Sequence, residues 1–164
     1  MVALIRPDSP RLWDIARVLV EEYAATLGVA LDFQGFEHER MHLPTQYGPP
    51  HGVFLLAQQD DAFVGCGAFR RFSDSACEMK RLYVGPSSQT RGIGRMIATA
   101  LIAEAERMGY REMLLDTLPA MHTAQALYAS LGFTPVPPYR LNPVPGAKFL
   151  KLDLRNAPPG PNRQ

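Results

Sequence analysis

Apolar positions in this chain recur with two different spacings, and the spacing predicts where helices and strands lie. Apolar residues three and four positions apart predict helices over residues 10–27, 92–108 and 123–131. A glycine follows each of them, at Gly28, Gly109 and Gly132, as is common after the last helical residue. The first helix has Ser9 as its N-cap and Pro10 at its first position.

Shorter apolar runs between turn residues predict strands over residues 2–6, 53–57, 62–69, 76–84, 113–118, 133–136 and 148–154. The three runs between residues 53 and 84 are joined by short polar turns, which predicts an antiparallel meander. A helix separates the strands at 76–84 and 113–118, so one strand–helix–strand crossover is expected. The element order predicts an α+β fold around a central mixed sheet.

The segment from Leu31 to Gly52 is polar and mixed in character. Residues 36–43 have helical spacing, and Pro44, Gly48, Pro49 and Pro50 then break regular structure. Such a segment fits either a substrate-facing loop or a plain connector. The chain contains no internal repeat and no linker, so a single domain over residues 1–155 is predicted, followed by a flexible tail over 156–164.

The composition of the chain indicates which classes of binding partner to expect. The chain has 164 residues, a formal net charge of +1 and a charged fraction of 20%. That balance gives no electrostatic reason to expect a nucleic acid or an anionic membrane as partner. The apolar start at residues 1–5 is too short for a signal peptide, and no apolar run approaches the roughly 20 residues that span a bilayer. A cytoplasmic location is therefore expected.

Two cysteines, Cys66 and Cys77, lie on the two arms of a predicted hairpin whose turn centres near Asp74. In that register Cys66 faces roughly Leu82, and Cys77 faces roughly Arg71. These two positions put the sulfur atoms about 15 Å apart along the strands. This separation is too long for a disulfide. Free thiols that pack as small buried residues are expected, with catalysis by either cysteine as the less common alternative.

The candidate chemistry lies where the strand at 76–84 runs through a loop into the long helix. The sequence there reads Gln89-Thr90-Arg91-Gly92-Ile93-Gly94-Arg95. Glycine lets the backbone approach a ligand closely, and the first turn of a helix offers unpaired N–H groups and a positive dipole end. Together with the two arginines this predicts a phosphate or pyrophosphate site. The glycines alone fit a plain helix start equally well. A Walker-type Gly-Lys-Ser/Thr and the third glycine of a Rossmann fingerprint are both absent.

The same residues carry a family resemblance. Gln89-x-x-Gly92-x-Gly94 matches the (Gln/Arg)-x-x-Gly-x-(Gly/Ala) signature of the GNAT superfamily of CoA-dependent N-acetyltransferases. The strand at 78–84 resembles the fourth strand of that family, and residues 126–133 resemble its A-x-x-L-Y-x-x-x-G-F block. The element order agrees from residue 2 to about 154. In detail the chain most resembles small bacterial members of unassigned substrate that share Glu-Met-Lys-Arg-Leu-Tyr-Val and the Asn-Pro-Val-Pro-Gly segment at 142–146.

The resemblance implies an α/β/α sandwich whose fourth and fifth strands splay apart, with acetyl-CoA as co-substrate in the gap. Backbone groups of the fourth strand are expected to pair with the pantetheine arm, here at Leu82, Tyr83 and Val84. The pyrophosphate is expected on backbone N–H groups from Gln89 to Arg95, that is Gln89, Thr90, Arg91, Gly92, Ile93, Gly94 and Arg95. Many relatives carry an asparagine at the start of the last helix. Residues 119–123 contain none, which leaves that contact without a candidate.

Two residues are predicted to be catalytic. Tyr128 matches the tyrosine that GNAT enzymes direct at the CoA sulfur, where a phenol can protonate the leaving thiolate. The alternative for Tyr128 is core packing. Glu78 is the candidate base for the incoming amine, provided that burial or a water chain makes it basic enough. The alternative for Glu78 is a salt bridge to Lys80 on the same strand face, and His122 is a second candidate base.

The remaining histidines, His38, His42 and His51, fall in the variable N-terminal segment and are expected near the acceptor pocket. Their spacing does not match a metal site, so no metal is expected.

The predicted function is transfer of acetyl to a primary amine of a small molecule. Acetylation of a protein lysine or N-terminus, a non-catalytic acyl-CoA-binding module and an unrelated structural domain are the alternatives. A homodimer through the C-terminal strands is expected by analogy alone.

Overall fold

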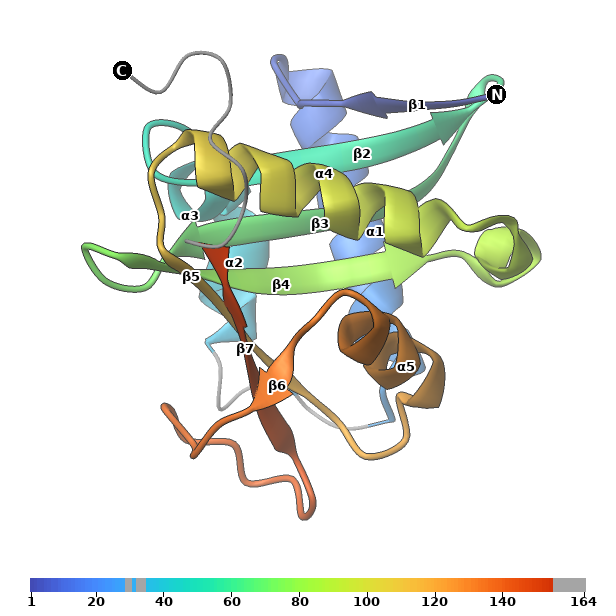
Figure 1. Ribbon diagram of the computed structural model, residues 1–164. Coiled ribbons are helices and arrows are strands. Elements are labelled where there is room, and N and C mark those ends of the chain that lie inside the picture. Colours follow the sequence, from blue (N-terminus) through green and yellow to red (C-terminus); the bar gives the residue numbers. More distant parts are fainter. Residues whose placement is uncertain (29–30, 32–34, 155–164) are drawn as a thin grey trace.

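The computed structural model describes residues 1–28, 31 and 35–154 (Figure 1). The predicted tail over 156–164 and the domain boundary at 155 therefore lie outside the described residues. The strands are β1 (Val2–Ile5), β2 (Val53–Gln59), β3 (Ala62–Arg71), β4 (Ala76–Val84), β5 (Glu112–Thr117), β6 (Thr134–Pro135) and β7 (Lys148–Asp153). The α-helices are α1 (Pro10–Thr26), α2 (Phe36–Met41), α3 (Leu43–Tyr47), α4 (Ile93–Arg107) and α5 (His122–Ser130), and a 3-10 helix, η2, covers Pro86–Arg91.

The seven strands form one mixed sheet in the order β1-β2-β3-β4-β5-β7-β6. Among the strands that the structure describes, β4 and β5 pair in parallel, and the other neighbouring pairs are antiparallel. Helix α4 covers one face of the sheet and α1 the other, with α2 and α3 beside α1 (Figure 1). The predicted α+β fold with helices on both faces of a mixed, mostly antiparallel sheet is confirmed.

Helix α1 begins and ends at the capping residues predicted from the sequence. The Ser9 hydroxyl accepts a hydrogen bond from the backbone N–H of Leu12 at 3.2 Å, and Gly28 follows α1 with a φ of +67°. One expectation was wrong: Pro44 does not break the structure but lies in the first turn of α3. Proline fits there because the first turn of a helix does not need its missing N–H. No helix among the described residues is long and apolar enough to cross a membrane.

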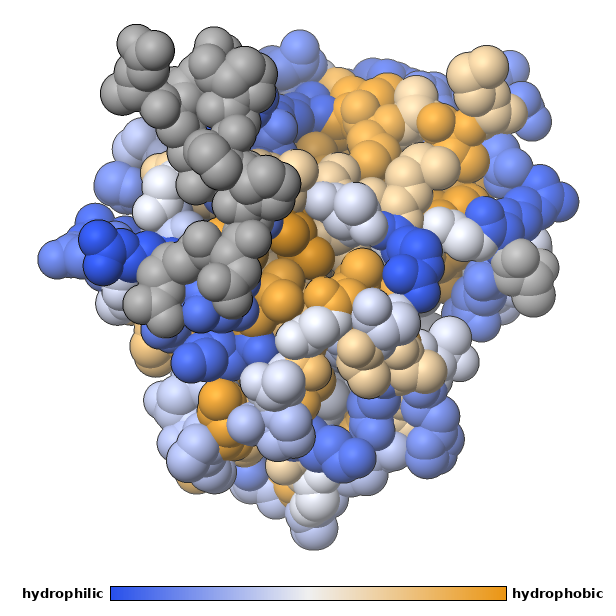
Figure 2. All heavy atoms as spheres, in the orientation of Figure 1, coloured by the Kyte–Doolittle hydropathy of each residue, from blue (hydrophilic) through white to orange (hydrophobic). Residues whose placement is uncertain are grey.

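Two apolar clusters pack on the two faces of the sheet. Seen from the α4 side, apolar side chains gather beside this helix toward the β1 end of the sheet, within an otherwise mixed surface (Figure 2). The cluster under α4 includes Ile97 and Leu101, both fully buried. The cluster under α1 includes Leu19 and Val20. Burial of such side chains on both faces supplies the main driving force for this fold.

A β-bulge in β4 decides which of its side chains face which helix. Cys66 of β3 pairs with Tyr83, whereas Ala68, two residues on, pairs with Lys80, so β4 contains one extra residue. Arg81 takes up that residue with a φ of +61°, an uncommon conformation for a non-glycine residue. The expectation that Cys66 faces Leu82 was therefore wrong by one position. Beyond the bulge Tyr83 packs under α1.

The two cysteines are free, as predicted, and both are fully buried. The pairing of Arg71 with Cys77 is also as predicted.

The bulge is held by a buried ion pair with α2. Glu39 accepts hydrogen bonds from Arg81 Nε at 2.6 Å and Arg81 Nη2 at 2.9 Å, and both side chains are 2% exposed. Burial acts to raise the pKa of Glu39, but the hydrogen bonds and charge of Arg81 outweigh it, so the pKa of Glu39 is lowered. The carboxylate is therefore ionised at neutral pH and ties α2 to β4.

We predict that Glu39→Gln lowers the free energy of unfolding by about 3–5 kcal/mol, because it leaves the Arg81 charge buried without its counterion. Urea unfolding at pH 7 measures this loss. The matched control is Glu37→Gln on the same helix, whose carboxylate pairs with Arg40 at the surface and is 73% exposed. The control should change stability little. Equal losses in the two variants would show that the buried pair does not hold the bulge.

Candidate functional site

The parallel pairing of β4 and β5 is short, and a cleft opens where it ends. The paired residues are Ala76–Glu78 with Glu112–Leu114. Beyond them the two strands diverge, and α1 and α5 contribute side chains to the gap. The gap contains an inner hollow near the closed end and an outer hollow toward the start of α4, with Tyr23, Leu82 and Met121 lining both.

The outer hollow brings together half of the residues predicted to bind the cofactor. Its lining includes Leu82, Tyr83, Val84, Gln89 and Gly94, faced by residues 120–124 and Leu127 at the start of α5. The Gln89 side chain donates to the Val84 carbonyl at 3.1 Å, which fixes the end of β4 to the loop before α4.

The other predicted cofactor residues lie around the start of α4. Gly92 has a φ of +72°, which glycine adopts without strain. Ile93 is fully buried in the core, so only its backbone can serve a ligand. Arg95 donates to the Ser130 hydroxyl at 2.7 Å, and Arg91 is exposed. Thr90 belongs to η2, and its side chain lies outside the described atoms.

The inner hollow is small, about 30 Å³, and combines apolar walls with a buried charge pair. Lys80 on β4 lies 3.9 Å from Asp116 on β5, with side chains only 3% and 6% exposed. Asn142, from the segment between β6 and β7, donates to the second oxygen of Asp116 at 3.1 Å. Burial, together with Arg81, lowers the pKa of Lys80 to about 8, although Glu78 and Asp116 oppose this shift.

Tyr128 on α5 lines the same inner hollow. Burial raises the pKa of its phenol well above the ordinary value, and the neighbouring Tyr23 and Asp116 raise it further. The hydroxyl is thus protonated at neutral pH. Its ring packs edge-on against Phe133, with the ring centroids 5.7 Å apart. The tyrosine therefore combines core packing with a place at the cleft.

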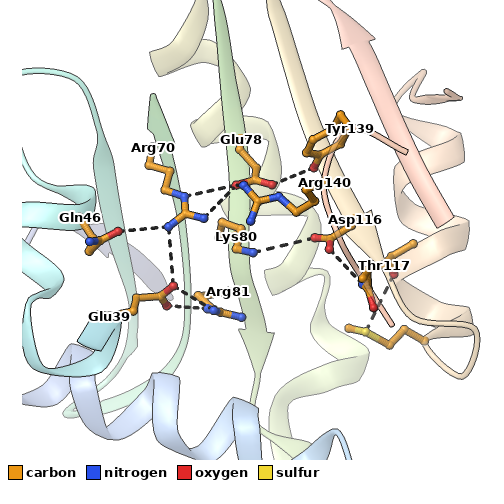
Figure 3. A network of polar contacts seen from close by, with 12 residues as sticks. Glu39, Gln46, Arg70, Glu78, Lys80, Arg81, Asp116, Thr117, Tyr139 and Arg140 are labelled. Carbon is orange, nitrogen blue, oxygen red and sulfur yellow. Dashed lines mark hydrogen bonds and ion pairs between the residues drawn. The ribbon is translucent and has the colours of Figure 1, made fainter. Parts of the chain in front are cut away.

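Glu78 lies at the closed end of the cleft and is fully buried (Figure 3). Its carboxylate accepts from Arg70 Nε at 3.2 Å, Arg140 Nη2 at 2.8 Å and the Tyr139 hydroxyl at 2.8 Å. It does not line the inner hollow. The alternative expected from the sequence was a salt bridge between Glu78 and Lys80. In the structure the Glu78 carboxylate instead accepts hydrogen bonds from these three donors. The role of Glu78 as base stays a prediction.

The histidines are dispersed. His122 begins α5, is exposed and lines the outer hollow. His38 and His42 stack on each other with ring centroids 4.1 Å apart, and His51 lies in the turn before β2. None of these three lines either hollow of the cleft. Within residues 1–28, 31 and 35–154, no group of three His, Cys, Asp or Glu side chains could hold a metal ion.

The polar residues of the inner hollow that were missed from the sequence include Tyr23, Lys80, Asp116 and Asn142. A usable signal existed for two of them, because Lys80 and Asp116 are charged positions inside strands that are otherwise largely apolar. Tyr23 continues the apolar stripe of α1 and gave no signal. Asn142 lies in a loop whose path depends on tertiary packing.

Comparisons with known proteins agree with this geometry. The model of the acetyltransferase (GNAT) family matches residues 13–133. An uncharacterized N-acetyltransferase of Schizosaccharomyces pombe is 37% identical over 147 residues, which cover 88% of this chain and 90% of that protein. An IAA acetyltransferase of Azospirillum brasilense is 31% identical over 154 residues, covering 92% and 97%.

Solved structures show the same fold. A GNAT-family acetyltransferase from Staphylococcus aureus superposes with a TM-score of 0.79 at 16% identity, over 94% of this chain and 99% of that one. A protein from Salmonella typhimurium, solved with its cofactor acetyl-CoA, superposes with a TM-score of 0.65 at 21% identity, over 95% of each chain.

We predict that Gly94→Leu weakens acetyl-CoA binding about tenfold or more, the loss expected when about 1.4 kcal/mol of contact at the helix start is blocked. Isothermal titration measures the effect. Gly94→Ala is the matched control, because a Cβ there meets only Leu127 and Val84, each at 3.8 Å. The control should bind like the unaltered protein. Undiminished binding by Gly94→Leu would place the phosphates elsewhere.

Proposed function

This chain belongs to the GNAT family of acetyltransferases, and we propose that it transfers the acetyl group of acetyl-CoA to a primary amine of a small molecule. It is an acetyl-CoA-dependent acyltransferase of GNAT type. The acceptor class, the placement of the cofactor and the roles of individual residues are the proposed part. The observation that carries the proposal is the pair of adjoining hollows between β4 and β5, with Tyr128 on the inner one.

In the proposed complex the pyrophosphate lies against backbone N–H groups from Gln89 to Arg95. The first turn of α4 favours an anion there because its N–H groups and dipole both point outward. The pantetheine arm follows the outer hollow along Leu82, Tyr83 and Val84, whose backbone on the β5 side is not paired with that strand. The acetyl group then enters the inner hollow beside Tyr128.

The chemistry requires two proton movements around one nucleophilic attack. The neutral amine attacks the thioester carbonyl, the new N–C bond forms, and the C–S bond breaks with its electron pair on sulfur. Tyr128 is proposed to give its phenolic proton to the departing thiolate. Glu78 remains the base predicted from the sequence. Its carboxylate already accepts three hydrogen bonds and does not line the inner hollow, so its support for catalysis would run through the buried network.

The residues around the inner hollow support a small acceptor. Tyr23 and Leu27 of α1, Leu31 and the loop residue Asn142 line it. Leu31 belongs to the segment for which a substrate-facing loop was one of two expectations, and its place at the hollow favours that alternative. A cytoplasmic location and a homodimer through β6 and β7 are further proposals.

Isothermal titration with acetyl-CoA, followed by thiol release across a panel of small primary amines and lysine-containing peptides, tests the proposal. Saturable binding with turnover on small amines supports it. Turnover on peptides alone would assign a protein acceptor. Binding without turnover on any amine would favour a non-catalytic acyl-CoA module.

We predict that Tyr128→Phe lowers kcat about 100-fold, the usual contribution of a general acid, with little change in acetyl-CoA affinity. Steady-state thiol release and isothermal titration measure the two quantities. Tyr110→Phe is the control, because that hydroxyl donates to the His51 carbonyl at 2.7 Å, away from the cleft. An unchanged kcat in Tyr128→Phe would remove the tyrosine from the mechanism.

A further inference from the structure

A largely buried chain of charges spans four parts of the molecule (Figure 3), and its Arg81 lines the inner hollow. Arg81 pairs with Glu39, Arg70 lies between Glu39 and Glu78, and Arg140 completes the chain at Glu78. The distances between charged atoms run from 2.6 to 3.9 Å. This chain holds three arginines and two glutamates, and Asp116 beside Lys80 adds a third carboxylate, so the charges of these neighbours balance.

Lys80 lies between this chain and the cleft. Its side chain is 3% exposed and lines the inner hollow together with Tyr128. Among the residues that the structure describes, the charged groups around it include Glu78 and Arg81 on its own strand, Asp116 on β5, Arg70 on β3, Glu39 on α2 and Arg140 before β7. The phenols of Tyr23, Tyr128 and Tyr139 all have raised pKa values, so they are neutral at physiological pH.

We propose that Lys80 is a catalytic residue: its Nζ takes the proton that the acceptor's ammonium group must lose before it attacks acetyl-CoA. The inference rests on the proposed function, and it assigns the role of base to a residue other than Glu78, the candidate from the sequence. Three observations carry it. Lys80 lines the hollow beside Tyr128, its burial disfavours the charged form, and Asp116 at 3.9 Å can hold the lysine once it is protonated.

The lowered pKa of Lys80, about 8, agrees with this role. A base is most effective when its pKa lies near the working pH. Glu78 is placed less well, because it lies outside the hollow and its oxygens already accept from three donors.

The proton count balances with Lys80 in place. One proton passes from the ammonium nitrogen to Lys80 Nζ and then to solvent. The amine attacks, the N–C bond forms and the C–S bond breaks. Sulfur takes the phenolic proton of Tyr128, and the second proton from nitrogen restores that phenol. The products are the amide, CoA thiol and one released proton.

The first test needs no acceptor. The chain has three lysines, Lys80, Lys148 and Lys151, so lysine labelled with carbon-13 at Cε gives three signals to titrate by NMR. Signal assignment comes from Lys80→Met. The expected result is one signal that titrates near pH 8 and is absent from that variant. A Lys80 signal that titrates near the ordinary lysine value of about 10.4 overturns the proposal.

The second test measures kcat/KM against pH on an amine found in the panel. Lys80→Arg keeps the positive charge but cannot release a proton near neutral pH, so it should be as inactive as Lys80→Met, about 100-fold or more below the unaltered protein. Lys148→Met, at an exposed position, is the control. A Lys80→Arg variant that keeps its activity would make Lys80 a charge that only positions the acceptor, which contradicts the proposal.

A third variant separates a base from a structural cation. Lys80→Cys alkylated with bromoethylamine carries a less basic amine on a side chain of the same length. The acid limb of its profile of kcat/KM against pH should therefore lie at lower pH than that of the unaltered protein with the same acceptor. The same treatment of the unaltered protein controls for Cys66 and Cys77, which are fully buried.

The outcomes keep the two proposals apart. An acid limb that does not move in the alkylated variant refutes the role of Lys80 and leaves the acetyltransferase proposal intact. Acetyl-CoA binding without turnover on any amine refutes both proposals.

Discussion

The cleft of the proposed site depends on one constraint: β4 pairs with β5 in parallel only up to Glu78 and Leu114. Beyond that point β4 still has β3 on one side, while its other edge faces a gap. Backbone groups at such an edge need partners, and a ligand carrying amide groups can supply them as an added strand would. The bulge at Arg81 falls within this open part of β4. The shape of the sheet thus prepares a linear site before any side chain is considered.

Buried charges hold this arrangement in place. The Glu39–Arg81 pair joins α2 to the bulge, and Glu78 joins β3, β4 and the segment before β7 through Arg70 and Arg140. Such pairs stabilise a fold weakly compared with a well-packed apolar core, but the loss of one partner is costly. A network of this kind therefore fixes geometry more than it adds stability. It also sets the electrostatic surroundings of the inner hollow, where Lys80 and Tyr128 lie.

Much of the fold follows from local rules that can be read in the sequence. Ser9, Gly28 and the apolar stripes define the helices, and the turns around Asp60 and Asp74 define the meander. The site was only partly predictable. Gln89 and Gly94 belong to a local motif, whereas the Lys80–Asp116 contact joins two strands that are not paired at that level. The bulge depends on how β4 meets β3, so it shifted the register at Leu82 without a local signal. Pro44 shows the same limit, since proline fits both a helix start and a break.

The most direct test of the cleft as the cofactor site is an NMR titration of backbone amide signals with acetyl-CoA. Binding between β4 and β5 should shift the signals of residues 82–84, 89–95 and 120–127, which border the outer hollow and the start of α4. Signals from α2 and α3 should change little. Shifts concentrated outside the β4–β5 gap, or no shifts at saturating acetyl-CoA, would contradict the placement of the site.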